Sequence, residues 1–275
     1  MSTTAADAAE NQSLKKKPRQ EETETPLEGL ASICNMLVVF LFLTAFLFQN
    51  FDIPSGSMEK TLLIGDHPLV DHMTFAPPSK WAFFMPYREI RRGDIIVFYK
   101  PNPVPPDPPD IILVKRAIGI PGDHIHLRNG IVYLNGVAQN EPQISKPDNS
   151  SSDPMALYNA YRDDFPSVQN GTQYGATESW AVEMPTHVEG DDLVVPPGKV
   201  FAMGDNRIAS LDSRFWGFVP RENILGRPLI LYWSFDTPAE QAEKQSFGDR
   251  VGFAFHVLIH IFDKTRWSRT LMVVR

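Results

Sequence analysis

A run of residues without any charge, from residue 29 to residue 51, constrains the fold of this chain more than any other feature. Its centre, residues 33–48, is rich in Leu, Val and Phe. A helix rises ~1.5 Å per residue, so about 20 residues cross the ~30 Å hydrocarbon layer of a membrane. A cleaved secretory signal is the alternative, but bulky residues follow the run where small residues would mark the cleavage site. The run therefore predicts a single transmembrane helix over residues 29–51.

The charges that flank this run indicate its orientation. Four basic residues precede it: Lys15, Lys16, Lys17 and Arg19. Only Lys60 lies at a comparable distance on the other side. Basic residues accumulate on the cytoplasmic side of a membrane, so we expect a cytoplasmic N-terminus and an extracytoplasmic region over residues 52–275. Residues 1–28 are polar and predict a disordered cytoplasmic tail.

The composition excludes several classes of protein. The chain has 275 residues, enough for one domain or for a core with a smaller insert. The net charge of -7 argues against a nucleic-acid-binding protein. The single cysteine, Cys34, lies in the apolar run, so neither an intramolecular disulfide nor a cysteine metal site can form. We expect no cofactor.

Short β-rich runs dominate the sequence after the apolar run. They lie at residues 94–99, 111–120, 125–128, 131–134, 199–203 and 229–235. Asn129 and Gly130 separate two of these runs, which is a strong signal for a β-hairpin. We therefore expect a mostly β protein, in which the membrane helix precedes a β-rich extracytoplasmic domain.

Two further segments differ from this pattern. Residues 143–192 are rich in Asp, Ser, Asn and Pro and have weak periodicity, which predicts a surface insert with little core of its own. We place the whole inserted β/loop domain at about residues 124–198. Residues 251–262 are twelve uncharged residues, too short for a second span, with basic residues after them. They predict an interfacial or packed helix, with a second membrane segment as the alternative.

Lys115 interrupts an otherwise apolar strand. Alternate residues of a strand share a face, so Lys115 lies with Ile111, Leu113 and Ala117. Burial of an ammonium without a partner lowers its pKa, and a neutral lysine amine can act as a general base near neutral pH. The alternative is a lysine whose amine reaches solvent at the strand end.

Two serines follow the apolar run in the motif Pro-Ser-Gly-Ser-Met. The rigid proline and the permissive glycine can present the Ser57 hydroxyl at a sharp bend and leave backbone N–H groups free. The N–H of Ser57 and the hydroxyl of Ser55 would then form an oxyanion hole. A simple turn is the alternative.

A third motif, Gly-Asp-Asn-Arg followed by Ser-Leu-Asp-Ser-Arg, begins at Gly204. Asp212 and Arg214 are spaced to project together from an extended segment and to form an ion pair. An exposed loop of acidic and basic residues is the alternative.

The three motifs, in this order behind a membrane helix, resemble those of the bacterial type I signal peptidases. The resemblance covers residues 51–231 apart from the insert. It implies a β-rich serine protease with a Ser/Lys dyad, anchored in the bacterial plasma (inner) membrane by one span. Such an enzyme removes signal peptides from exported preproteins as these emerge from the secretion machinery. The expected partners are therefore preproteins and membrane lipid, without nucleic acid, metal or cofactor.

The resemblance also implies a role for individual residues. Ser57 is expected to be the nucleophile and Lys115 the general base, with the Ser57 N–H and the Ser55 hydroxyl as the oxyanion hole. Ser210 is expected to orient the lysine amine. The other supporting positions are Asp212, Arg214, Arg116, Gly204 and Asp205. The family binds small side chains at the first and third positions before the cut in shallow apolar pockets, and the matching wall positions are Phe51, Ile53, Pro54, Met58, Leu62, Leu113 and Val114.

The sequence is also compatible with other functions. The same dyad occurs in specialised processing peptidases of narrower substrate range and in self-cleaving repressors, although a repressor would need an N-terminal DNA-binding helix pair. A membrane-anchored binding module without catalysis is the non-enzymatic alternative. His124 and His126 share a strand face, and His256 and His260 lie one helical turn apart, but neither pair has a third ligand, so we expect no metal site.

Overall fold

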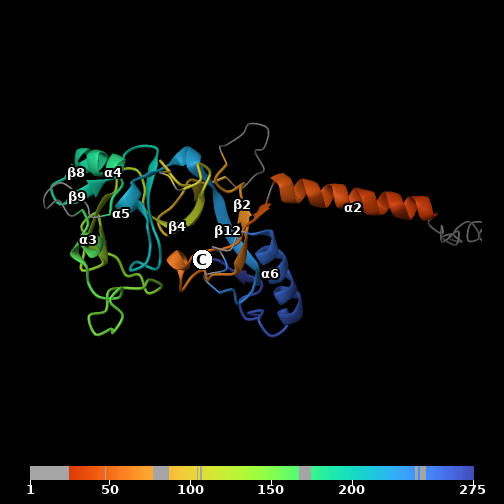
Figure 1. Cartoon of the computed structure of the whole chain (residues 1–275). Coiled ribbons are helices and arrows are strands. Elements are labelled where there is room, and N and C mark those ends of the chain that lie inside the picture. Colours follow the sequence, from red (N-terminus) through yellow and green to blue (C-terminus); the bar gives the residue numbers. More distant parts are fainter. Residues whose placement is uncertain are drawn as a thin grey trace, which may run out of the picture. The chain divides into compact units, whose positions relative to one another are not determined.

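The computed structural model describes residues 25–46, 48–76, 87–103, 105, 107–166, 175–238, 241 and 246–275 (Figure 1). The chain divides into two compact units, one that ends at Leu43 and one that runs from Thr44 to Arg275. The smaller unit contains most of helix α2 (Pro26–Phe46), and the larger unit contains two β-sheets.

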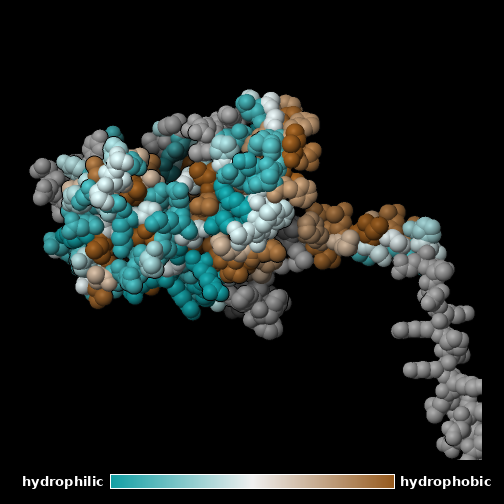
Figure 2. Space-filling model, turned by 90° about the horizontal axis from the view of Figure 1, so that it is seen from below, coloured by the Kyte–Doolittle hydropathy of each residue, from teal (hydrophilic) through white to brown (hydrophobic). Residues whose placement is uncertain are grey.

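Helix α2 begins with a capping box. The Glu28 carboxylate accepts a hydrogen bond from the Thr25 N–H at 2.7 Å, and the Glu28 N–H donates to the Thr25 hydroxyl at 3.4 Å. Apolar side chains such as Leu30, Ile33 and Leu37 are more than half exposed, and the helix is largely hydrophobic in Figure 2. Among the residues described, no helix combines the length and the apolar character that are needed to cross a membrane.

The helix is shorter at its C-terminal end than the sequence predicted. It ends at Phe46, and Phe48–Asn50 forms strand β1 instead. Gln49 and Asn50 pair there with Val70 and Leu69 of the neighbouring strand. The uncharged run over residues 29–51 therefore did not predict where the helix ends. Backbone pairing with strand β2 decides the conformation of residues 48–50.

Within the described residues, the larger sheet has eight strands in the order β1-β2-β12-β3-β4-β10-β11, with β13 also paired to β12. Every strand pair in it is antiparallel. The strands are β1 (Phe48–Asn50), β2 (Asp66–Asp71), β3 (Ile95–Tyr99), β4 (Ile112–Gly119), β10 (Lys199–Met203), β11 (Val219–Pro220), β12 (Ile224–Ser234) and β13 (Met272–Val273). The prediction of a mostly β protein is confirmed.

The smaller sheet has five strands in the order β7-β6-β5-β9-β8. They are β5 (His124–Arg128), β6 (Ile131–Leu134), β7 (Val137–Ala138), β8 (Val188–Glu189) and β9 (Asp192–Val194). The predicted hairpin joins β5 to β6, and Asn129 and Gly130 adopt positive φ angles of 51° and 73° at its turn. Such angles are what a tight two-residue hairpin turn requires.

The segment 143–192 contributes more to the core than the sequence predicted. Phe165, Trp180 and Met184 are at most 1% exposed and pack with Ile125 and Leu193 of the smaller sheet. They lie in or beside short elements, which explains why no period links them. These elements are α3 (Ala160–Asp163), α4 (Glu178–Glu183) and η3 (Met184–His187). The segment is therefore more than a surface insert, although the core to which it contributes is shared with the sheets rather than its own.

The C-terminal helix α6 (Phe247–His260) confirms the helix predicted near residues 251–262. One face packs on the end of β12, where the rings of Phe253 and His256 lie 6.2 and 6.1 Å from the ring of Phe235. The other face carries exposed apolar side chains, including Phe255 and Leu258. The helix is seen beside β12 in Figure 1. Three short elements complete the description: η1 (Gly56–Met58), α5 (Ser213–Trp216) and η4 (Arg221–Asn223).

Candidate active site

Ser57 lies in η1, a 3-10 helix of one turn, which we call the serine turn. Met58, the next residue, is 1% exposed, and Leu62 is 0% exposed; both pack in one apolar cluster with Ile53. These side chains hold the turn on the sheet, so that Ser57 remains partly exposed. The motif thus gives a serine hydroxyl at the surface of a firmly packed turn.

Lys115 approaches this serine from the middle of the larger sheet. It lies on β4 opposite Ile96 of β3 and is 3% exposed. Its Nζ lies 2.5 Å from the Ser57 Oγ, although the two residues are 58 positions apart in the sequence. The structure therefore brings together the two residues that the sequence singled out.

The surroundings of Lys115 favour its neutral form. Burial is the largest cause and lowers the pKa of Lys115 from 10.5 to about 8. The negative charge of Asp212 opposes this change, and the positive charge of Arg214 adds to it. A lysine amine with such a pKa is unprotonated in a large part of the molecules at mildly alkaline pH, and an unprotonated amine can accept a proton from a serine.

The two other serines of the motifs differ in their contacts. The Ser55 hydroxyl lies 3.3 Å from the Ser57 hydroxyl. Ser210 is 7% exposed, and its hydroxyl has no hydrogen-bond partner among the described residues. The bond from Ser210 to the lysine amine that the resemblance implies is therefore not formed in this structure.

Gly204 lets these groups approach one another. A Cβ atom at this position would lie 2.3 Å from the Ser210 Oγ and 2.4 Å from the Ser57 carbonyl oxygen. Its backbone lies outside the left-handed region, so the requirement for glycine here is one of space. Ser57, Ser210 and the start of the 204–214 loop are thus packed against one another.

Two buried ion pairs support the site. Arg116 binds Asp205 through two hydrogen bonds of 2.8 and 2.6 Å, and Asp205 also accepts one from Thr61, which follows the serine turn. Asp212 and Arg214 form the second pair, and both side chains are 0% exposed. The predicted pair is confirmed but the predicted extended segment is wrong, because Asp212 caps helix α5 and Arg214 lies in that helix. Burial raises the pKa of Asp212, but the Arg214 charge and its hydrogen bond outweigh this effect, so the pKa lies below its ordinary value.

The predicted pocket residues do not all lie at the surface. Ile53, Met58, Leu62 and Val114 pack in one apolar cluster. Leu113 packs against the neighbouring cluster, whereas Pro54 is exposed and Phe51 is partly exposed. Met58 and Leu62 are buried. Any contact with a bound peptide would therefore come from the more exposed members of the set.

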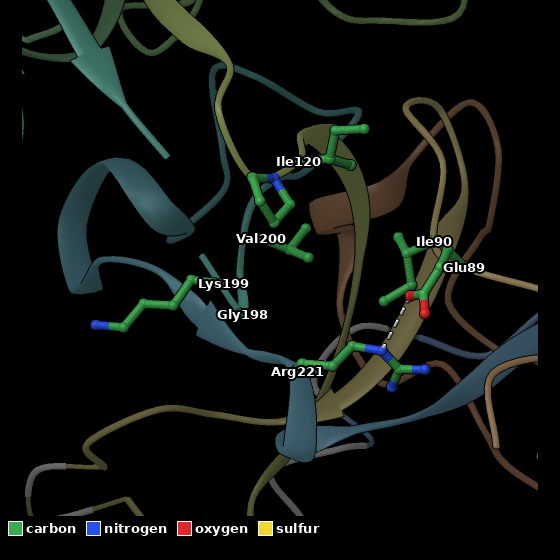
Figure 3. Close-up of a pocket in the computed structure, with 8 residues that line it drawn as sticks. Glu89, Ile90, Ile120, Gly198, Lys199, Val200 and Arg221 are labelled. Carbon is green, nitrogen blue, oxygen red and sulfur yellow. Dashed lines mark ion pairs between the residues drawn. The ribbon is translucent and has the colours of Figure 1, made fainter. Parts of the chain in front are cut away.

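A depression of about 300 Å³ lies next to this segment. Ile53 and Pro54 line one side of it, and Arg250 and Phe253 of α6 line the other. A larger cavity of about 440 Å³ lies where the chain passes between the two sheets, beside Ile120 and Lys199 (Figure 3). None of the predicted site residues lines this larger cavity. We therefore place the candidate active site around Ser57 and Lys115 rather than in the larger cavity.

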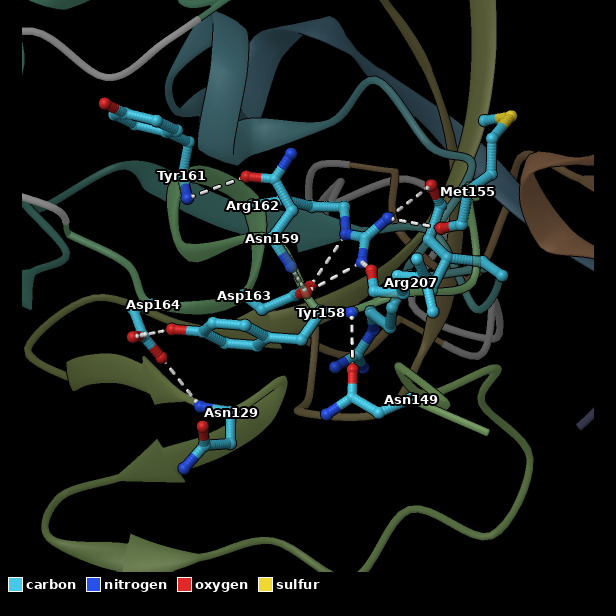
Figure 4. Close-up of polar contacts among 12 residues, drawn as sticks. Asn129, Asn149, Met155, Tyr158, Asn159, Tyr161, Arg162, Asp163, Asp164 and Arg207 are labelled. Atoms are coloured by element: carbon cyan, nitrogen blue, oxygen red, sulfur yellow. Dashed lines mark hydrogen bonds and ion pairs between the residues drawn. The ribbon is translucent and has the colours of Figure 1, made fainter. Parts of the chain in front are cut away.

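Sequence reasoning missed residues that hold the 204–214 loop. Arg162 donates to the carbonyl oxygen of Ile208 at 3.3 Å and pairs with the buried Asp163 (Figure 4). Arg214 in turn donates to the carbonyl oxygen of Arg162 at 3.1 Å. Arg162 follows a polar stretch without a motif, so no sequence signal marked it. Asn206 lies inside the Gly-Asp-Asn-Arg motif, but the sequence suggested no role for it.

Two pairs of histidines were considered as metal ligands, and their surroundings differ. His126 Nδ1 lies 2.5 Å from the Asp192 carboxylate and stacks on Tyr133. The rings of His256 and His260 lie 4.5 Å apart on α6. In the part of the chain that the structure describes, no group of three or more His, Cys, Asp or Glu residues could hold a metal ion.

A family model and relatives of similar sequence indicate one family. The family model for signal peptidase, peptidase S26, matches residues 27–233. A signal peptidase I from Aquifex aeolicus is 32% identical over 76% of this chain and 85% of its own length. One from Leptolyngbya laminosa is 30% identical over 83% of this chain and 90% of its own. The crystal structure of a signal peptidase I from Enterococcus faecalis V583 covers 51% of this chain and 97% of its own, with 28% identity and a TM-score of 0.35.

Proposed function

The chain belongs to the signal peptidase family, peptidase S26, and from this premise we propose that it is a membrane-bound serine endopeptidase that removes N-terminal signal peptides from exported preproteins. The observation that carries the proposal is the distance of 2.5 Å between the buried Lys115 Nζ and the Ser57 Oγ. A serine and a lysine of lowered pKa can perform peptide hydrolysis without a histidine.

In the proposed first step, the neutral Lys115 amine takes the proton of the Ser57 hydroxyl. The Ser57 oxygen then bonds to the carbonyl carbon at the cleavage site, and the electron pair of the carbonyl moves to its oxygen. When this intermediate collapses, the C–N bond breaks, and the Lys115 ammonium gives its proton to the departing amine of the mature protein. The signal peptide remains as an ester of Ser57.

In the second step, Lys115 takes a proton from water, and the resulting hydroxide attacks the ester. Collapse of this second intermediate releases the signal peptide and returns the proton to Ser57. The negative oxygen formed in both steps would bind the Ser57 N–H and the Ser55 hydroxyl. Loss of one such donor typically lowers kcat ~100- to 1,000-fold.

The supporting residues keep this arrangement fixed in the proposal. Arg116 and Asp205 join β4 to the segment after the serine turn, and Asp212 and Arg214 lie beside the lysine. The Ser210 hydroxyl has no hydrogen-bond partner among the described residues, and in the proposal it turns towards the amine when a substrate is bound. The preference for small residues at the first and third positions before the cut would come from the partly exposed members of the pocket set, among them Leu113 and Val114.

Helix α2 is the proposed membrane anchor. It has no charged residue between Gly29 and Phe46, and its described apolar side chains are exposed rather than packed in a core. With basic residues concentrated before it, the catalytic unit would lie outside the bacterial plasma membrane, where exported preproteins emerge. Within that unit, we keep residues 124–198 as a proposed insert. Two results would support this topology: membranes that retain the protein after washing at alkaline pH, and degradation of the catalytic unit by a protease added only to the outer side.

Membrane lipid is also the proposed partner of the outer face of α6. Phe255, Leu258 and Ile259 are 61%, 68% and 72% exposed, whereas Phe253, whose ring lies 6.2 Å from that of Phe235, is only partly exposed. An apolar helix face at the surface, followed by basic residues, is typical of helices that lie in the membrane interface. Weaker retention of a Leu258→Ser, Ile259→Ser double variant that lacks α2, measured on anionic lipid vesicles, would support this contact.

Cleavage of a preprotein with an Ala-x-Ala site tests the whole proposal. The detergent-solubilised protein should cut it, and Ser57→Ala and Lys115→Ala should not, while both remain folded by circular dichroism. Lys199→Ala removes a lysine that pairs with Glu183 away from the site and serves as the matched control. Full activity of Lys115→Ala would exclude lysine as the base. No cleavage by the unchanged protein would favour a peptidase of narrower substrate range or a binding module.

A further inference from the structure

Asn206 contacts the serine turn in two ways at once. Its backbone N–H donates to the carbonyl oxygen of Ser57 at 3.1 Å. Its side-chain Nδ2 donates to the carbonyl oxygen of Gly56 at 3.1 Å and to the Glu59 carboxylate at 3.3 Å. Asn206 is only 7% exposed. Asn206 therefore binds the carbonyl groups on both sides of the Ser57 side chain, and the Glu59 N–H is a second donor to that of Gly56, at 3.0 Å.

The contact with Gly56 has a specific consequence. The carbonyl of Gly56 and the N–H of Ser57 belong to the same peptide unit, which is planar and trans, so the two groups point in opposite directions. A donor that fixes the direction of the Gly56 carbonyl therefore also fixes the direction of the Ser57 N–H. A hydrogen bond to the carbonyl oxygen also polarises the peptide unit and strengthens its N–H as a donor.

Asn206 can perform this task because its own position is fixed. The loop before it accepts a hydrogen bond at the Asp205 carbonyl oxygen from the Ser145 N–H at 2.9 Å. The next residue, Arg207, is 1% exposed and forms an ion pair with Glu141. The segment 141–145 thus stabilises the loop on both sides of Asn206, through the Ser145 N–H and the Glu141 side chain.

We propose that Asn206 is a positioning residue that orients the Ser57 N–H as an oxyanion donor, acting through the peptide unit between Gly56 and Ser57. The inference rests on the proposed function, because it assigns a task within the reaction of Ser57. Asn206 touches neither the substrate nor the Lys115 amine in this arrangement. Its loss should therefore weaken the stabilisation of the transition state and leave the pKa of Lys115 unchanged.

The test compares steady-state cleavage of one Ala-x-Ala preprotein by the unchanged protein and by Asn206→Ala. We expect kcat to fall ~10- to 100-fold, less than for removal of an oxyanion donor itself. KM and the midpoint of the pH profile of kcat/KM should remain the same, because the ground state and the base are not affected. The affinity for a peptide aldehyde, which adds to Ser57 and forms an oxyanion, should fall by the same factor as kcat.

A matched control removes the same kind of bond elsewhere. Asn223 also donates through its side-chain amide to a backbone carbonyl, that of Tyr99, at 3.0 Å. Asn223→Ala should keep kcat. If Asn206→Ala does not fold, Asn206→Asp retains the shape and replaces the donor by an acceptor, so it should lose at least as much kcat.

Three kinetic results would each overturn the inference: a kcat of Asn206→Ala or Asn206→Asp close to that of the unchanged protein, a loss confined to KM, or an equal loss in Asn223→Ala. Each of these is distinct from failure of the proposed function, in which the unchanged protein itself would not cleave the preprotein. The outcome in which the aldehyde binds equally well to both proteins also contradicts the inference.

Discussion

Asp212 and Arg214 act on the amine of Lys115 with opposite signs while they neutralise each other. Arg214 Nε donates to Asp212 Oδ1 at 2.8 Å, and neither side chain is exposed. Burial is the largest cause of the lowered pKa of Lys115, Asp212 opposes it, and Arg214 adds to it. Because the two charges are paired, neither dominates, and burial sets the direction of the change.

This relationship predicts opposite shifts in the pH profile for two variants. Arg214→Gln removes the positive charge, so the remaining carboxylate should raise the pKa of Lys115 and move the rise of kcat/KM to higher pH. Asp212→Asn leaves the positive charge and should move the rise to lower pH. The measurement is the midpoint of kcat/KM against pH, which for the unchanged protein should lie at about 8.

Both substitutions leave one buried charge without its partner, which typically costs about 3–5 kcal/mol of stability, so the assays belong at low temperature. Arg92→Gln breaks an ion pair with Asp123 away from the site and should leave the midpoint unchanged. Shifts of the same sign in the two variants would contradict this account of Lys115.

The buried lysine should also lower the stability of the fold. At about pH 7, the unfolded chain carries a charged Lys115 at little cost, whereas the folded protein must bury this charge or release its proton. The difference between a pKa of 10.5 and one of about 8 corresponds to about 3 kcal/mol. Lys115→Met also loses the hydrogen bond to Ser57, which lowers the stability of the variant by about 1 kcal/mol. The variant should therefore be more stable than the unchanged protein by about 2 kcal/mol.

The sign of the pH dependence follows from the same pKa. Between about pH 8 and pH 10.5 the unfolded chain binds more protons at Lys115 than the folded protein does, so the free energy of unfolding of the unchanged protein rises with pH in this window. The advantage of Lys115→Met should therefore be full below pH 8 and lost near pH 10.5. Urea unfolding of both proteins at several pH values measures this difference, and an advantage independent of pH would refute the explanation.

The dyad could be proposed from the sequence because the three motifs together resemble those of one family, whereas each motif alone left an alternative open. A lysine in an apolar strand and two serines around a glycine are visible without tertiary information, and so is the spacing of Asp212 and Arg214. The contribution of Trp180 and Met184 to the core could not be predicted, because they lie on short turns of helix without a repeat. The position of Asn206 against the serine turn depends on a contact over about 150 residues, which no local pattern encodes.

The space at Gly204 gives a prediction about geometry. A methyl group in Gly204→Ala would meet the Ser57 carbonyl oxygen and the Ser210 side chain, both at less than the closest normal contact. The serine turn must then move, and a displacement of about 1 Å in an active site can lower kcat ~100-fold. Gly252→Ala is the matched control: its added methyl meets nothing within 4 Å, and alanine favours a helix, so activity should persist. Equal activity of both variants would show that the turn tolerates the shift.

The C-terminal segment, which lies beyond the 27–233 match to the family model, should stabilise the region after the serine turn. Arg269 pairs with Asp66, which is 0% exposed, and its Nη2 donates to the carbonyl oxygen of Thr61 at 2.9 Å. Arg269→Ala leaves the Asp66 carboxylate buried with Arg266 4.0 Å away. We expect a loss of about 2–4 kcal/mol, slightly less than for a buried ion pair that loses its sole partner.

A double-mutant cycle separates this pair from the general effect of losing an arginine. In Asp66→Asn the carboxylate is already neutral, so adding Arg269→Ala should cost much less there than in the unchanged protein, with a coupling of about 1–3 kcal/mol in urea unfolding. Arg250→Ala, at an exposed position of α6, should be nearly neutral. Strict additivity of the Asp66 and Arg269 substitutions would mean that the contact between these two side chains contributes nothing to stability.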